Sequence, residues 1–160
     1  MKKVRALIVD DSFFLVELIS QILERSGKFT IVGKAYNGEE AVKAAIETGP
    51  DIISMDIKMP GMKGLDALSD IINKHICPVV MVSAHTNEGS TLLAKALTLG
   101  AIDYIKKPGG ASPSDTSFAE ELVQTLYTAS SGISARKLSK GYPKVNLPKP
   151  VAAPISGVFN

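Results

Sequence analysis

Apolar positions along the first 130 residues follow two alternating patterns. Short, nearly continuous apolar runs have the length of buried strands. Each is followed by a segment whose apolar residues recur every three or four positions, as on one face of a helix. Five such alternations predict an α/β fold, a doubly wound parallel sheet of five strands with helices on both faces. The predicted strands are 3–9, 29–36, 51–55, 79–84 and 101–105, and the predicted helices are 13–25, 37–49, 65–74, 88–99 and 117–130.

Two helix starts carry a capping-box pattern, in which a small polar residue caps the helix and an acidic residue three positions later reaches back. Asn37 and Glu40 form the first pattern, ahead of a helix that stops at Gly49. Ser117 and Glu120 form the second. These positions predict where the second and fifth helices begin.

The composition is that of a soluble globular domain. Of the 160 residues, 45% are apolar and 21% are charged, and no apolar run approaches the roughly 20 residues that span a bilayer. Asp10 and Asp11 interrupt the first apolar segment too early for a secretory signal. The single cysteine, Cys77, cannot form an internal disulfide, which suits a reducing compartment. We therefore expect a cytoplasmic protein without membrane insertion.

Charge divides the chain into two parts. Thirteen of the 18 basic residues and all 16 acids lie in residues 1–135, so this part carries a net charge of −3 and the remainder carries +5. The end of the chain also contains four prolines between residues 141 and 160. We predict a folded domain over 1–130 and a basic, Pro-rich linker over 131–160. Five cations spread among prolines make a weak footprint for nucleic acid, so we expect none to bind.

Chemically capable side chains follow four of the predicted strands. Because the carboxyl ends of parallel strands meet at one edge of a sheet, Asp10, Asp11, Asp56, Ser83 and Lys107 are expected to converge there. Three clustered acids are tolerable only if they are neutralised. Hard carboxylate oxygens suit Mg²⁺, and a hydroxyl with a lysine suits the oxygens of a phosphoryl group. Asp56 would then be the nucleophile that forms an acyl phosphate.

Four motifs carry a resemblance to a known family. "VDDS", "MDIKMPGMKG", "MVSA" and "KKPGG", in this order, resemble the receiver domain of two-component response regulators over about residues 1–130. "PVVMVSA", "LGAIDYIKKPGG" and the following linker are similar to the receiver half of chemotaxis protein-glutamate methylesterases (CheB). The resemblance implies the strand order 2-1-3-4-5. It also implies a Mg²⁺ cofactor and a CheA-like histidine kinase as phosphodonor.

The resemblance also implies roles for the acids and the residue near them. Asp56 accepts the phosphoryl group and also faces the metal. Asp11 binds Mg²⁺ directly, Asp10 binds it through water, and Lys58 contributes its backbone carbonyl.

For the phosphoryl group, the resemblance implies binding by Ser83 and Lys107. Ser83 and Tyr104 would form a switch pair, in which the ring turns inward when the hydroxyl is drawn toward phosphate. Pro108 would follow a cis peptide bond. Tyr104 also has a simpler interpretation as edge packing, and Asp11 or Ser12 can also serve as the cap of the first helix.

The chain departs from the family pattern at two places. Lys58 stands two residues after the acceptor, where an acidic or amide side chain is usual, and Met62-Lys63-Gly64 replaces Met-Asp-Gly. Lys58 adds a cation near the site without removing the carbonyl ligand. We therefore predict an altered phosphoryl lifetime.

Three functions remain possible at this point. The leading interpretation is a phosphorylation-controlled switch whose linker leads to an output methylesterase domain or to a chemoreceptor. The second is a stand-alone adaptor receiver that binds a partner protein. The third, a flavin- or nucleotide-binding domain, is opposed by the first strand–helix turn, "DDSFF", which has two acids and no glycine. With two histidines and no Gly-x-Ser-x-Gly motif, the chain offers little scope for an esterase triad of its own.

Overall fold

The computed structural model describes residues 2–59, 64–84, 87–108 and 116–134. Strands and helices alternate strictly along these ranges, as the sequence predicts. Their bounds are β1 Val4–Val9, α1 Phe13–Arg25, β2 Phe29–Ala35, α2 Gly38–Thr48, β3 Ile52–Asp56, α3 Gly64–Asn73, β4 Val79–Ser83, α4 Asn87–Leu99, β5 Asp103–Lys106 and α5 Thr116–Ala129.

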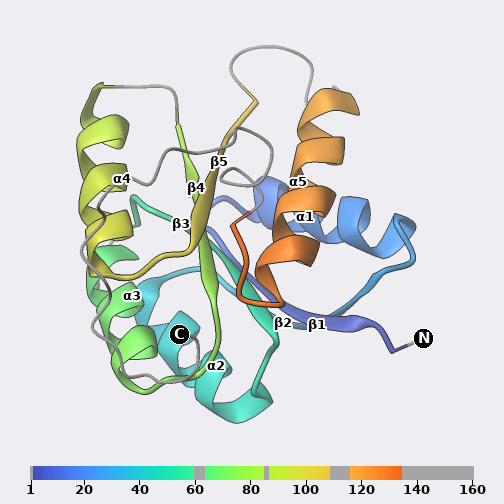
Figure 1. Ribbon diagram of the computed structural model, residues 1–160, viewed down its shortest axis with the longest axis horizontal. Helices are drawn as coiled ribbons and strands as arrows, with labels where there is room; N and C mark the ends of the chain where they lie inside the picture. The colour runs from blue at the N-terminus through green and yellow to red at the C-terminus, as the bar shows by residue number, and fades with distance from the viewer. Residues whose placement is uncertain (1, 60–63, 85–86, 109–115, 135–160) are drawn as a thin grey trace.

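The described strands form one parallel sheet in the order β2-β1-β3-β4-β5. Figure 1 shows α1 and α5 on one face of this sheet and α2, α3 and α4 on the other. The predicted doubly wound fold and its strand order are confirmed. Because the order reverses between β1 and β3, the carboxyl ends of these two strands flank the position where such sheets bind ligands.

The core has two parts, one on each face of the sheet. Side chains alternate along each strand, so Leu7, Ile53 and Met81 pack under α2, α3 and α4. Ile8 and Ile105 pack under α1 and α5. All five are less than 1% exposed, which explains why the central strands are almost continuously apolar.

Polar residues fix the ends of the first two helices. Ser12 is the N-cap of α1, and its Oγ accepts a hydrogen bond from the N–H of Leu15 at 3.2 Å. Asn37 caps α2 by accepting the N–H of Glu40 at 2.8 Å, and α2 ends at Gly49 in the left-handed conformation (φ 55°). The predicted bounds of α2 are therefore confirmed.

The second capping-box prediction places the cap at the wrong residue. α5 begins at Thr116, so Ser117 lies inside the first turn and cannot be the N-cap. Ser, Thr and Asp all favour the N-cap, and residues 114–117 are all of these types, so the pattern alone does not fix which of them caps the helix. Among the described helices, none is long and apolar enough to cross a bilayer. The predicted linker lies outside the described residues from residue 135 onward.

Candidate functional site

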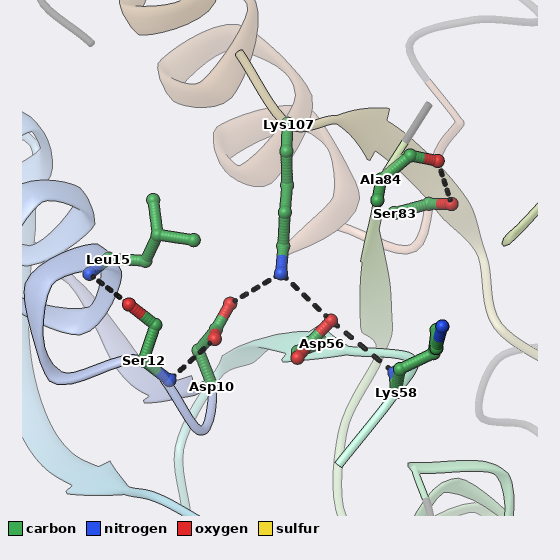
Figure 2. Close-up of polar contacts among 8 residues, drawn as sticks. All are labelled: Asp10, Ser12, Leu15, Asp56, Lys58, Ser83, Ala84 and Lys107. Carbon is green, nitrogen blue, oxygen red and sulfur yellow. Dashed lines mark hydrogen bonds and ion pairs between the residues drawn. The ribbon is translucent and has the colours of Figure 1, made fainter. Parts of the chain in front are cut away.

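A lysine joins two buried carboxylates at the carboxyl edge of the sheet. Lys107 Nζ lies 3.2 Å from Asp10 Oδ2 and 3.1 Å from Asp56 Oδ1, and Figure 2 shows its side chain extended between them. Asp10 is 1% exposed and Asp56 is 3% exposed. The three residues lie at the ends of β1, β3 and β5, so the predicted convergence of separate strands is found.

Backbone groups hold the two carboxylates in place. Asp10 Oδ1 accepts the N–H of Ser12 at 2.9 Å, in the same turn that starts α1. Asp56 Oδ1 accepts the N–H of Lys58 at 3.4 Å. The N–H of Lys107 donates to the carbonyl of Ser83 at 2.8 Å, which fixes the lysine to the end of β4. The site is thus built from turns tied to the sheet and not from free loops.

The acidic cluster fits a hard divalent cation. Carboxylate oxygens of Asp10, Asp11 and Asp56 all lie within 4.8 Å of one another, and Asp11 is the exposed member. Asp10 Oδ2 has no hydrogen bond of good geometry within the described residues, and the Lys107 ammonium lies 3.2 Å from it. A buried oxygen with this spare capacity, in a site of oxygen ligands alone, matches the preference of Mg²⁺.

Burial and neighbouring charges raise the pKa values of both buried carboxylates. Burial, together with the negative charge of Asp10, raises the pKa of Asp56 to about 7, against the attraction of Lys107. Burial also raises the pKa of Asp10, although the N–H of Ser12 and the Lys107 ammonium oppose the shift. Burial alone would lower the pKa of Lys107, but the two carboxylates outweigh it and raise the pKa. A second cation would therefore be attracted here, because one lysine faces three acids.

Ser83 and Tyr104 lie on the other side of the sheet edge. Side chains alternate along a strand, so Asp56 and Lys107 continue the α1 and α5 face, whereas Ser83 continues the face under α3 and α4. Ser83 is buried, and its hydroxyl donates to the carbonyl of Ala84 at 3.2 Å. Tyr104 is half-buried and packs against the α3 and α4 core. Their predicted switch roles stay predictions.

The expected cis bond before Pro108 is not found. The described residues, which include Lys107 and Pro108, contain no cis peptide bond, so this bond is trans. The trans form is the more stable one for most X–Pro bonds. The departure at Met62-Lys63-Gly64 lies outside the described residues.

Two exposed aromatic residues beside the acids are absent from the sequence-based prediction. Phe13 is 67% exposed and Phe14 is 60% exposed, at the start of α1. Phe13 stacks against Tyr36, with ring centroids 6.0 Å apart. Their exposure could have been predicted from helical periodicity. Both residues lie off the apolar stripe of α1 that includes Val16 and Ile19 and faces the core.

Comparison with known proteins decides the family. Residues 6–113 match the model of the response regulator receiver domain. The chain belongs to the response regulator receiver family. Among solved structures, this receiver is similar to the response regulator domain of Thermotoga maritima CheB, with 40% identity, a TM-score of 0.74 and coverage of 81% of this chain and 98% of that one.

Curated relatives of this receiver are longer proteins. It is 43% identical over 129 residues to a protein-glutamate methylesterase/protein-glutamine glutaminase of Caldanaerobacter subterraneus, covering 80% of this chain and 35% of that one. A protein of the same name from Archaeoglobus fulgidus is 43% identical over 127 residues, covering 79% and 36%. This receiver therefore spans about a third of the length of the curated relatives that it matches.

Proposed function

We propose that the chain is a phosphorylation-controlled receiver that accepts a phosphoryl group on Asp56 in a Mg²⁺-dependent reaction. The observation that carries this proposal is the position of Asp56, a buried carboxylate 3.1 Å from Lys107 and clustered with Asp10 and Asp11. A lysine with a purely structural role would need only one acid to balance its charge, whereas three acids cluster here. The additional acids fit a metal and an incoming group that brings its own charge.

The chemistry follows from the positions of the side chains. An oxygen of Asp56 attacks phosphorus, and the new O–P bond forms as the P–N bond to a donor imidazole breaks, leaving the electron pair on that nitrogen. Mg²⁺ would be held by Asp11, Asp56 and the Lys58 carbonyl directly and by Asp10 through water, and it would neutralise charge on the phosphoryl oxygens. Lys107 keeps Asp56 oriented before transfer and then pairs with a phosphoryl oxygen.

A protein phosphodonor fits the surface beside the site. Phe13 and Phe14 are more exposed than any other large apolar residue of the described chain, and both follow the Asp10–Ser12 turn directly. Exposed apolar area beside a reactive group favours contact with another protein. We propose a CheA-like histidine kinase as the donor, acting in the cytoplasm.

The proposed output is a methylesterase. The curated relatives carry the name protein-glutamate methylesterase/protein-glutamine glutaminase, and about two thirds of their length lies beyond the matched region. In this interpretation the linker connects the receiver to that catalytic domain or brings it to a chemoreceptor. The alternative, a stand-alone adaptor, would lack a catalytic domain in the adjoining coding sequence, which is a direct way to separate the two.

The chemical nature of the adduct tests the proposal. After incubation with Mg²⁺ and radiolabelled acetyl phosphate, the protein should retain label that hydroxylamine releases, as expected for an acyl phosphate. Asp70→Asn is the matched control, because Asp70 is a partly exposed acid on α3 whose partner is Lys74, at 3.0 Å. Label that survives hydroxylamine, or that persists in Asp56→Asn, would contradict the proposal.

A further inference from the structure

The segment that follows α5 turns back and binds the first residue of β5. Ser134 Oγ donates a hydrogen bond to Asp103 Oδ2 at 3.1 Å, and Figure 1 shows the end of the coloured chain running back between α5 and the sheet. Asp103 is only 3% exposed. Its second oxygen accepts the N–H of Tyr104 at 2.8 Å. Because a buried carboxylate is costly without donors, this contact is worth more than a surface hydrogen bond.

A glycine turn directs the segment to this position. The N–H of Ser131 donates to the carbonyl of Thr128 at 3.1 Å, and the N–H of Gly132 donates to that of Ala129 at 2.8 Å. Gly132 has φ +81°, a conformation that side chains other than glycine rarely adopt. The turn closes the carboxyl end of α5 and reverses the chain, so that Ser134 reaches Asp103.

The same strand carries the lysine of the acidic site. Asp103, Ile105 and Lys107 alternate onto one face of β5 and its extension. Ile105 is fully buried in the core beneath α5, and Lys107 contacts Asp56. Within the described residues, β5 pairs only with β4. One short edge strand therefore joins the start of the predicted linker to the acidic site.

We propose that the Asp103–Ser134 hydrogen bond is a strap that holds the start of the linker on β5 and loosens when Asp56 carries a phosphoryl group. The proposal rests on the proposed phosphorylation of Asp56. A phosphoryl group extends outward from the Asp56 carboxylate and draws Lys107 away from its present ion pairs. The resulting shift of β5 against α5 acts on a hydrogen bond that tolerates displacements of only a few tenths of an ångström.

Thermodynamic linkage allows two tests of the strap, one of the effect of phosphoryl binding on the strap and one of the effect of the strap on phosphoryl binding. If phosphoryl occupancy weakens the strap, then removing the strap must strengthen binding of a phosphoryl analogue by the same factor. For a hydrogen bond to a buried carboxylate we expect a change in affinity of at least about threefold. Ser134→Ala removes the donor. Ser131→Ala is the matched control, because Ser131 is exposed and its N–H contact in the turn is retained.

The experiment is amide hydrogen exchange on the full chain, with and without Mg²⁺ and beryllofluoride, read for β3 and for residues 130–134. We expect the amides of 130–132 to be protected in the wild type and in Ser131→Ala, and to lose protection when the analogue binds. Ser134→Ala should lack that protection in both states and bind the analogue at least about threefold more tightly.

Two outcomes would contradict the proposal of a strap, and the experiment distinguishes them. If β3 responds to the analogue while 130–134 do not, or if Ser134→Ala exchanges and binds like Ser131→Ala, the strap is wrong and phosphorylation of Asp56 stands. If β3 does not respond either, the proposed function fails and the strap fails with it.

Discussion

Lys107 bridges two strands of the sheet by placing its ammonium 3.1 Å from a carboxylate oxygen of Asp56, the residue that ends β3. The lysine stands where a phosphoryl group would need a cation, and it already neutralises part of the acidic cluster. This single contact links stability, metal affinity and reactivity, so each can be predicted from it.

Replacing Lys107 by methionine should separate these effects. The side chain keeps its apolar length, but Asp10 and Asp56 lose their shared cation. Loss of one partner of a buried ion pair should lower the free energy of unfolding of the metal-free protein by about 2 kcal/mol or more. Removing the competing cation should tighten Mg²⁺ binding, while phosphorylation slows. Denaturant unfolding and Mg²⁺ titration measure the first two; Lys106→Met, at an exposed position, should change neither.

The raised pKa of Asp56 predicts an unusual dependence of stability on pH. Between its ordinary value of 3.8 and about 7, the folded metal-free protein holds a proton that the unfolded chain releases. The free energy of unfolding contributed by this group therefore falls as pH rises from about 4 to 7. Asp56→Asn removes the titrating group and should be more stable than the wild type at pH 8 by at least about 1 kcal/mol. Denaturation at pH 5 and pH 8 without metal tests this, and equal pH slopes in the two proteins would contradict it.

The unusual cation at Lys58 should change the lifetime of the phosphoryl group. The N–H of Lys58 donates to Asp56, so the residue adjoins the acceptor, and its positive charge stands where an acidic or amide side chain is usual in the family. Lys58→Glu should shift the dephosphorylation rate, and we expect a change of at least about threefold. Lys106→Glu makes the same charge change at an exposed position of β5. Identical rates for wild type and Lys58→Glu would refute the prediction.

The exposed aromatic residues predict a difference between two kinds of phosphodonor. Phe14→Ser leaves the acidic cluster intact, so labelling by acetyl phosphate should be unchanged. Transfer from an autophosphorylated chemotaxis histidine kinase should slow by about tenfold, because burial of a phenylalanine contributes roughly 1.5–3 kcal/mol. Ile46→Ser is the control, since Ile46 is 57% exposed on α2. Equal slowing with both donors would show that Phe14 supports the site itself.

The fold could be predicted from the sequence because the apolar periodicity and the capping residues indicated the same elements. The bounds of α1 match the apolar periodicity at both ends, and Asn37 and Gly49 mark the ends of α2 as their chemistry dictates. The acidic site could be predicted for a related reason. In a parallel sheet, residues that follow different strands meet at one edge, so Asp10 and Asp56 needed no long-range information beyond the strand pattern.

Other features depended on packing that the pattern does not record. The Asp103–Ser134 contact joins residues 31 positions apart, and neither residue type signals the other. The trans bond before Pro108 departs from the family expectation, and it is the more stable form of most X–Pro bonds. Period-two alternation could have placed Ser83 on the face opposite Asp56, but it does not predict that the hydroxyl donates to the carbonyl of Ala84.

The most direct measurement of the central claim is the mass of the intact chain and of its peptides after incubation with acetyl phosphate. With Mg²⁺, the account predicts one phosphoryl adduct per chain, located on the peptide that contains Asp56, and none in Asp56→Asn or after chelation of the metal. An adduct on another residue, or one that forms equally well without a divalent cation, would contradict it.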